Sequence, residues 1–317
     1  MSKKTKKALF TFVLVIAMML INEFFGESYA YKNNTYVSND VEITSNTVLK
    51  VHYLDVGQGD SIFLELPNKK SMLIDASIYE MSNKIINYIE ELNYSKIDYL
   101  VATHPHSDHI GGMKAVVNNF DLGLIYMPKA ITTTKTYENL LQAISDKGMK
   151  IKTAKAGIVV IDEDDLKAEI VAPNSSSYED LNNYSIVLKI TYKNRSFLFT
   201  GDAEKISEDE ITSNVKSDVL KIGHHGSSSS TSASFLDKVN PTVAVISVGK
   251  DNSYNHPTKT VLNRLEKRNI EVYRTDLNGN IIMTTDGEKI KIEVEKTSGS
   301  NSWSYWRRIF SGWNRRR

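Results

Sequence analysis

Three of the seven histidines of this 317-residue chain fall within six consecutive positions, and an aspartate lies among them. The segment that contains them runs from Thr103 to Gly112 (THPHSDHIGG). An apolar run typical of a strand, Tyr99–Ala102, ends directly before it, and the two glycines at its end allow tight backbone turns. The chemically active side chains of this loop are His104, His106, Asp108 and His109.

The spacing of these side chains is typical of a metal-binding loop. The alternate residues His104 and His106 can face one ion, and the adjacent pair Asp108 and His109 is then offset towards a second. Imidazole and carboxylate ligands together suit zinc, with manganese or iron as alternatives. The competing interpretation is a polar surface loop whose histidines have no chemical role.

The amino-acid composition excludes several other classes of protein and site. The chain has no cysteine, which excludes disulfides, cysteine-based zinc fingers, iron–sulfur clusters and cysteine nucleophiles. Hydrophobic residues make up 41% of the chain and charged residues 24%, enough for a sizeable core. The net charge of +1 is uneven, with +2 on residues 1–30, +5 on residues 301–317 and −6 on the remainder. A mildly acidic body is by itself a poor nucleic-acid-binding surface.

The two ends of the chain differ from its body. Residues 1–30 combine four lysines, an apolar run (ALFTFVLVIAMMLI) and the small residues Ser28 and Ala30. This is the pattern of a signal peptide or, if uncleaved, of an N-terminal anchor. Residues 31–48 predict a linker, residues 49–296 one folded domain, and residues 297–317 a Trp/Arg-rich tail. We therefore expect a secreted protein, or one anchored at the outer face of the cell membrane.

The body alternates between β-branched runs and helical patterns. Runs typical of strands lie at Leu49–Leu54, Ser61–Leu66, Ser71–Ile74, Ile97–Ala102, Tyr184–Tyr192, Ser196–Thr200, Asp218–Ile222, Thr242–Val248, Ile270–Tyr273, Ile281–Thr284 and Lys289–Val294. Helical patterns lie at Asn83–Leu92, after His109, near Ala203–Thr212 and at Thr258–Arg268. This order predicts an α+β fold of two sheets packed face to face with helices outside.

Two further segments end apolar strands with polar side chains. The run Phe197–Gly201 leads to Asp202, whose charge is costly there unless it meets a cation, so we expect a carboxylate that bridges two metals. The alternative is a helix cap. A second strand leads to His224 and His225 before a glycine turn. Adjacent side chains diverge in an extended backbone, so only one of these histidines is expected to reach a metal.

The HxHxDH loop, the Gly-Asp strand end and the His-Gly turn, in this order, resemble the metallo-β-lactamase-fold hydrolases. Residues 54–61 (LDVGQGDS) are similar to the opening of the hydrolase domain in ComEC-type competence (DNA-uptake) proteins, and the similarity continues to Asn255-His256-Pro257. The resemblance implies an αββα sandwich with a metal site along one sheet edge. The many transmembrane helices that surround this domain in ComEC proteins have no counterpart in this sequence.

The resemblance also assigns metal ligands. They are His104, His106, Asp108, His109, Asp202 and His225. The first two would hold metal one, the next two and His225 metal two, and Asp202 would bridge two zinc ions, with manganese as the alternative. The superfamily usually supplies another histidine before the bridging aspartate, but none occurs between His109 and His224. Metal one would then be completed by solvent.

Other polar residues receive roles in the same way. The candidates for catalysis are Asp108, Lys221, His224 and His256. His256 or His224, with Lys221 nearby, would hold a phosphate or protonate the leaving oxygen. Asp75 is expected to hydrogen-bond a metal-binding histidine, with a helix cap as the alternative. Asp60 is interpreted as stabilising a turn, and His52 as structural.

The tail contains every tryptophan of the chain. Trp303, Trp306, Phe310 and Trp313 recur at helical spacing beside five arginines. This composition favours binding to an anionic membrane or wall surface. Stacking on single-stranded nucleic acid and packing on the chain's own domain are the alternatives.

The sequence as a whole predicts an exported, metal-dependent hydrolase, a phosphodiesterase or nuclease that acts through a metal-activated hydroxide. DNA, nucleotides and cell-wall phosphoesters are candidate substrates. The alternative is a non-catalytic metal-bound module that binds the cell envelope. A β-lactamase is disfavoured by the missing histidine. An iron-dependent reductase of this fold is disfavoured because such enzymes typically have Glu in place of His106.

Overall fold

The computed structural model describes residues 37–39, 41–45 and 47–295. The predicted export signal and the Trp/Arg-rich tail lie outside these ranges. Within them, no helix combines the length and the apolar character needed to cross a membrane.

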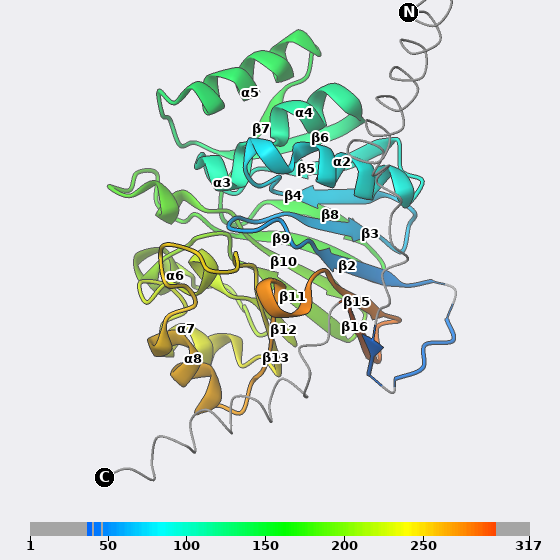
Figure 1. Ribbon diagram of the computed structural model, residues 1–317, viewed down its shortest axis with the longest axis vertical. Coiled ribbons are helices and arrows are strands. Elements are labelled where there is room, and N and C mark those ends of the chain that lie inside the picture. Colours follow the sequence, from blue (N-terminus) through cyan, green and yellow to red (C-terminus); the bar gives the residue numbers. More distant parts are fainter. Residues whose placement is uncertain (1–36, 40, 46, 296–317) are drawn as a thin grey trace, which may run out of the picture. The chain divides into compact units, whose positions relative to one another are not determined.

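The strands form two sheets (Figure 1). The larger has nine strands in the order β1-β16-β15-β2-β3-β4-β5-β6-β7, and the smaller has seven in the order β14-β13-β12-β11-β10-β9-β8. The larger sheet contains β1 (Val37–Ser38), β2 (Leu49–Tyr53), β3 (Ile62–Glu65), β4 (Ser71–Ile74), β5 (Lys96–Val101), β6 (Asp121–Pro128), β7 (Ile151–Ala154), β15 (Ile281–Thr285) and β16 (Ile290–Val294). The smaller contains β8 (Val159–Glu163), β9 (Leu166–Ala172), β10 (Val187–Tyr192), β11 (Arg195–Phe199), β12 (Val219–Lys221), β13 (Val243–Ile246) and β14 (Glu271–Arg274).

An apolar core lies between the two sheets. Alternate residues of facing strands build it, such as Val51 and Tyr53 of β2 and Phe197 and Phe199 of β11, all of them buried. The rings of Tyr53 and Phe199 approach to 6.2 Å between centroids. Because successive strand residues point to opposite faces, the intervening residues face outwards and pack against helices.

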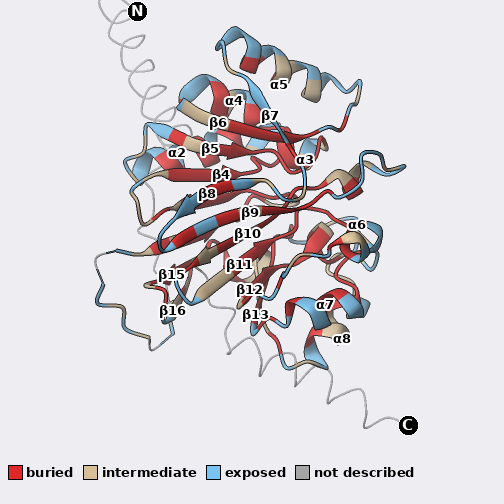
Figure 2. Ribbon diagram, turned by 180° about the vertical axis from the view of Figure 1, so that it is seen from behind, coloured by how far each residue is buried: buried red, intermediate tan, exposed pale blue. Residues whose placement is uncertain are grey.

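Helices cover the outer face of each sheet, and buried residues follow both interfaces (Figures 1 and 2). Over the larger sheet lie α2 (Ser82–Glu91), α4 (Met113–Asn119) and α5 (Lys135–Asp146). Over the smaller lie α7 (Ala233–Val239) and α8 (Lys259–Glu266), with α6 (Lys205–Glu210) beside α7. The short elements are α3 (Ser107–Ile110), α9 (Thr275–Asn278), η1 (Tyr79–Met81), η2 (Leu181–Tyr184) and η3 (Gly223–Gly226). This helix–sheet–sheet–helix order confirms the αββα fold expected from the sequence.

Parallel pairing in both sheets brings the polar loops together. β4 and β5 are parallel, as are β11, β12 and β13. The histidine loop follows β5, Asp202 follows β11, and His224 and His225 follow β12. Sites in such sheets form outside the carboxyl ends of the strands, and all these residues lie there.

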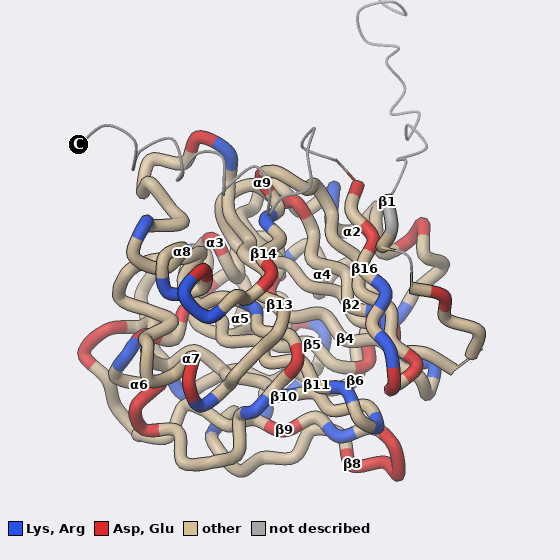
Figure 3. The backbone as a smooth tube through the Cα atoms, turned by 90° about the horizontal axis from the view of Figure 1, so that it is seen from below, with Lys and Arg blue, Asp and Glu red and all other residues tan. Residues whose placement is uncertain are grey.

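The strands and helices expected between residues 49 and 294 are present, with ends that differ by a few residues. One strand lies inside the predicted linker, because Val37 of β1 pairs with Val294 of β16. Basic and acidic residues are interspersed along the folded chain (Figure 3).

Candidate metal centre

The histidine loop lies over the carboxyl end of β5. α3 begins at Ser107, so Asp108 and His109 are on its first turn. His104 and His109 are buried, and His104 Nε2 lies 3.0 Å from His106 Nδ1. The pair His104 and His106 and the pair Asp108 and His109, which were expected to face two different ions, thus belong to one cluster of side chains.

The β2–β3 loop packs directly on this loop because residue 59 is glycine. A Cβ atom at Gly59, whose φ is +134°, would overlap the carbonyl oxygen of Asp108 and Oγ of Ser77. The next backbone N–H, that of Asp60, donates to the Asp108 carbonyl at 3.2 Å. This close contact places the Asp60 carboxylate next to His109 and His225.

Asp202 lies at the centre of the cluster. After β11, Gly201 takes a φ of +51° and turns the chain, and the carboxylate that follows is buried. Its Oδ1 is 3.3 Å from His109 Nε2. Its Oδ2 is 3.9, 3.8 and 3.6 Å from the Nε2 atoms of His104, His224 and His225. One carboxylate therefore faces four imidazoles.

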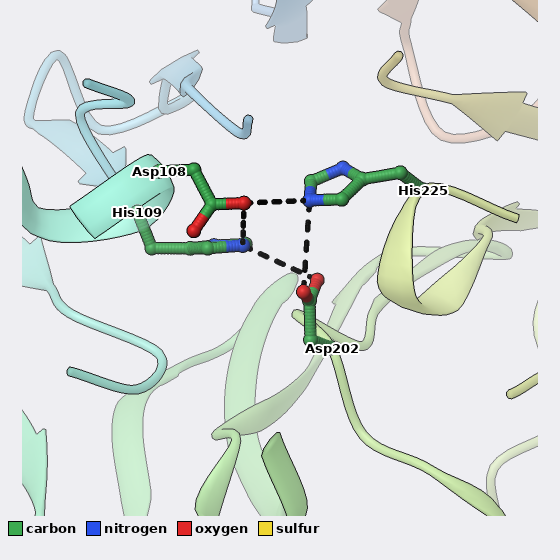
Figure 4. A group of neighbouring side chains, drawn as sticks. All are labelled: Asp108, His109, Asp202 and His225. Atoms are coloured by element: carbon green, nitrogen blue, oxygen red, sulfur yellow. Dashed lines mark ion pairs between the residues drawn. The ribbon is translucent and has the colours of Figure 1, made fainter. Parts of the chain in front are cut away.

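Asp108, His109, Asp202 and His225 form a compact group (Figure 4). One ligand atom from each lies within 4.8 Å of all the others. His109 Nε2, His225 Nε2 and Asp202 Oδ1 are buried and have no hydrogen-bond partner among the described residues. Such buried atoms are costly unless something satisfies them. Nitrogen and carboxylate donors in this arrangement fit a divalent metal ion.

Asp75 orients His109. Its Oδ2 lies 2.8 Å from His109 Nδ1, and because a carboxylate accepts, that nitrogen carries the proton and Nε2 is directed to the cluster. The carboxylate is held in turn by Thr103, whose backbone N–H and hydroxyl donate to it at 2.8 and 2.6 Å. Asp75 thus hydrogen-bonds the histidine, as the sequence suggested.

His225 is oriented by a carbonyl and by a buried ion pair. Its Nδ1 donates to the backbone oxygen of Ser247 at 2.9 Å and lies 3.4 Å from Asp60 Oδ1. Asp60 Oδ2 is paired with Lys221 Nζ at 2.5 Å. Lys221 is fully buried and does not line the pocket next to the cluster. It therefore contacts Asp60 rather than the space open to a substrate.

Opposite charges outweigh burial in the cluster. Burial alone would raise the pKa of Asp202, but His109 and His225 hold it well below its usual value. Burial lowers the pKa of His225, but Asp202, Asp108 and Asp60 together raise it to about 9. The raised pKa values of His109 and His225 favour protons on these two histidines, which balance the carboxylates in the metal-free protein. A divalent cation would take the place of those protons.

A cavity of about 500 Å³ opens beside the cluster. The residues that line it include His106, Asp108, Asp202, His224 and His225 of the cluster, together with Thr132, Thr134, Thr136, Asn182, Tyr254 and His256. None of the described residues that line it is Lys or Arg.

His256 and Tyr254 stand together in this cavity. The His256 ring lies 5.7 Å from that of His224, and 5.7 Å from the nearly parallel ring of Tyr254, which is 66% exposed. Asn252 fixes the loop by accepting from the His256 backbone N–H and donating to its carbonyl. Burial, with the nearby His224 and His225, lowers the pKa of His256 to about 4. His52 lies outside the site, bonded to Tyr88 and Glu65.

The model of one protein family, the metallo-β-lactamase superfamily, matches residues 54–250. The chain belongs to the metallo-β-lactamase superfamily. Curated relatives include ComE operon protein 3 of Bacillus subtilis (33% identical over 252 residues) and Competence protein ComA of Neisseria gonorrhoeae (29% over 248). These alignments cover 73% and 77% of this chain but 32% and 33% of the relatives, so the chain spans about a third of their length. They confirm the resemblance to ComEC-type proteins.

A solved structure with a similar fold is CmlA, a diiron β-hydroxylase from Streptomyces venezuelae. It aligns with a TM-score of 0.51 and 13% identity, over 76% of this chain and 55% of that chain. At this identity the similarity concerns the fold alone.

Sequence reasoning did not find every residue of this metallo-β-lactamase site. It assigned no role to Tyr254 or to the threonines near α5, which reach the cavity from loops that carry no metal ligand. The choice of Asp60 as the partner of Lys221 leaves no local pattern in the sequence, because these residues belong to different sheets. A buried lysine in a strand is nevertheless a sign of a partner carboxylate.

Proposed function

We propose that this chain is a metal-dependent hydrolase of phosphodiester bonds. The single observation that carries the proposal is the buried Asp202 carboxylate, which faces four histidine Nε2 atoms at 3.3–3.9 Å on the floor of an open cavity. His104, His106, Asp108, His109, Asp202 and His225 would hold two zinc ions, or manganese.

A bound metal would supply Lewis acidity, a lowered pKa of coordinated water, and positive charge that no described Lys or Arg brings to the cavity wall. Neighbouring residues determine which ring nitrogen of each histidine faces the metal position. Asp75 holds the His109 proton at Nδ1, and the Ser247 carbonyl holds the His225 proton at Nδ1. Both Nε2 atoms are thereby left free to bind.

His256 is the residue suited to touch the substrate. Its lowered pKa keeps the ring neutral at neutral pH, so it can donate one hydrogen bond to a phosphoryl oxygen. A neutral ring is a weak acid, which favours this hydrogen bond over protonation of the leaving oxygen. His224 and Asp108, which also line the cavity, are candidates for further contacts with the reacting group.

A nucleic acid or nucleotide is the substrate class that we favour. Two relatives are named Competence protein ComA and Recombination protein 2, and the exposed Tyr254 ring at the cavity offers a face for a base. We further propose that residues 1–30 export the chain or anchor it to the membrane, and that the tail binds an anionic membrane or wall surface.

The test uses the full chain, stripped of metal and reloaded with zinc or manganese. We expect cleavage of bis(p-nitrophenyl) phosphate and of a short single-stranded DNA, and loss of both in Asp202→Asn, which keeps the side-chain shape. Metal that binds with no cleavage of either phosphodiester would reject the proposal in favour of a non-catalytic metal-bound module.

A further inference from the structure

His224 and His225 share an unusual backbone conformation. Their φ and ψ angles are 48° and 47°, and 52° and 20°, so both lie in the left-handed region. Non-glycine residues seldom adopt this region. Two such residues in succession are held in place only where the surroundings require them, and such places cluster at functional sites.

The surroundings fix this turn from several sides. The His224 backbone N–H donates to the Gly201 carbonyl at 3.1 Å, next to Asp202, and its own carbonyl accepts from Ser227 at 2.8 Å. Gly226, with a φ of +88°, packs so closely on Pro257 that a Cβ atom would overlap the ring. The turn is therefore built into the fold.

The consequence is that the two adjacent imidazoles converge. In an extended backbone they would diverge, as the sequence analysis assumed. Here the Nε2 atoms of His224 and His225 lie 3.8 and 3.6 Å from the same atom, Asp202 Oδ2. The expectation that only one of them reaches the cluster rests on a backbone that the chain does not have.

His224 also directs Nε2 to Asp202 and has a carboxylate beside Nδ1. His109 and His225 direct Nε2 to Asp202 and Nδ1 to an oxygen acceptor, the arrangement usual for metal-binding histidines. In His224 the Nδ1 atom is buried without a hydrogen-bond partner among the described residues, and the Glu204 carboxylate lies beside it, with Oε1 3.3 Å away. Glu204 is itself fixed, because the Ser229 hydroxyl donates to the same oxygen at 2.7 Å.

The first metal position needs one more protein ligand. His104 and His106 are available there, with nitrogens 3.0 Å apart, and Asp202 Oδ2 lies 3.9 Å from His104 Nε2. We propose that His224 is the third histidine of this position. The superfamily usually supplies the third histidine from the chain before the bridging aspartate, but this sequence has none between His109 and His224. His224, which follows β12, would take that place.

The distances suit this assignment. A tetrahedral ion with bonds of about 2.1 Å has ligand atoms about 3.4 Å apart. Three separations among these ligand atoms lie within about half an ångström of that value: 3.0 Å for His104–His106, 3.8 Å for His224–Asp202 and 3.9 Å for His104–Asp202. Each position then has three side chains of its own and shares Asp202. The inference concerns metal binding and holds for any substrate.

The experiment measures metal content and cobalt spectra of the full chain, not turnover. The variant is His224→Gly, since glycine takes a positive φ without strain and the turn is kept; His224→Ala is made beside it. The wild type should bind two Co²⁺ ions. His224→Gly should bind one Co²⁺ ion tightly and the second at least tenfold more weakly. The spectrum of its tightly bound ion should match that of the ion which remains in His104→Ala. The double variant His224→Gly/His104→Ala should have nearly the same metal content and cobalt spectrum as His224→Gly alone.

Two matched variants sharpen the result. His256→Ala removes a neighbouring cavity histidine that has no contact with Asp202, and it should keep both ions. His225→Ala should lose the ion at the second position and keep the cobalt spectrum of the ion held by His104 and His106. Two ions with unchanged affinity in both His224 variants, a residual spectrum like that of His109→Ala, or a single ion in the wild type would overturn the assignment.

Discussion

Lys221 of the smaller sheet places its Nζ 2.5 Å from Oδ2 of Asp60, which belongs to the β2–β3 loop of the larger sheet. Both side chains are buried, and Asp60 Oδ1 lies 3.4 Å from Nδ1 of His225. The pair therefore joins the two sheets and supports a side chain of the metal centre at the same time.

Breaking this pair should destabilise the fold. Lys221→Met leaves the Asp60 charge buried without its cation, which costs about 3–5 kcal/mol of unfolding free energy. Urea unfolding of the metal-free protein measures it. The control is Lys205→Met, which breaks the exposed pair with Asp209 and should change the unfolding free energy by about 0.5 kcal/mol or less. Equal effects of the two changes would contradict the structural role of Lys221.

Stability of the metal-free protein should fall at alkaline pH. His225 has a folded pKa raised to about 9 against an ordinary value of 6.5, so its contribution is complete below pH 6.5 and is lost as the pH rises through about 9. Urea unfolding at several pH values, in the presence of a chelator, should follow that window. His225→Gln should flatten it, and a wild-type stability that rises from pH 6.5 to 9 would refute the prediction.

Loss of the shared carboxylate should affect both ions. Asp202→Ala should lower the content of both metals, whereas His104→Ala should release one. Asp75→Asn still accepts one hydrogen bond and should weaken metal affinity by only about 10–100-fold. Elemental analysis of the purified variants checks this order. Unchanged metal content in Asp202→Ala would rule out bridging.

The exposed ring of Tyr254 should matter only for substrates that carry a base. Stacking of one base is worth about 1–3 kcal/mol, so Tyr254→Ala should raise KM for a thymidine dinucleotide about tenfold or more. Tyr254→Phe keeps the ring and should behave like the wild type. An abasic analogue should show no difference among the three proteins, and an equal loss on both substrates would contradict stacking.

Removing residues 301–317 should separate surface binding from catalysis. Each arginine near an anionic membrane contributes about 1 kcal/mol, and salt screens it. The truncated protein should cleave a small phosphodiester normally but no longer sediment with anionic vesicles at low salt. If it loses thermal stability instead and still sediments, the tail packs on the domain.

The sequence predicted the order of layers because strand and helix patterns are strong wherever one face is buried. It assigned no strand to β6, β7, β8 or β9. Two of these, β7 and β8, lie at sheet edges, and an edge strand such as Ile151–Ala154 exposes most of its residues and shows no alternation. The amphipathic helix Lys135–Asp146 was within reach of the same method, since Leu140, Ala143 and Ile144 are its buried face.

The site was predictable where the ligand and its strand are neighbours in the sequence. The histidine loop and Asp202 each follow an apolar run, so their position at a sheet edge could be deduced. The direction of His224 could not, because it depends on a left-handed backbone that contacts with Gly201 and Pro257, distant in the sequence, hold in place. Long-range contacts of that kind leave no local pattern.

The metal centre draws its side chains from both layers, with the histidine loop on the larger sheet and Asp202, His224 and His225 on the smaller. An ion bound between them would act as a clamp across the sandwich, since separating the layers would require the ion to lose half of its ligands. Part of the binding energy would thus oppose opening of the interface. Amide hydrogen exchange should then slow on metal binding in strands such as β6 and β13, which carry no ligand but pair with β5 and β12, which do.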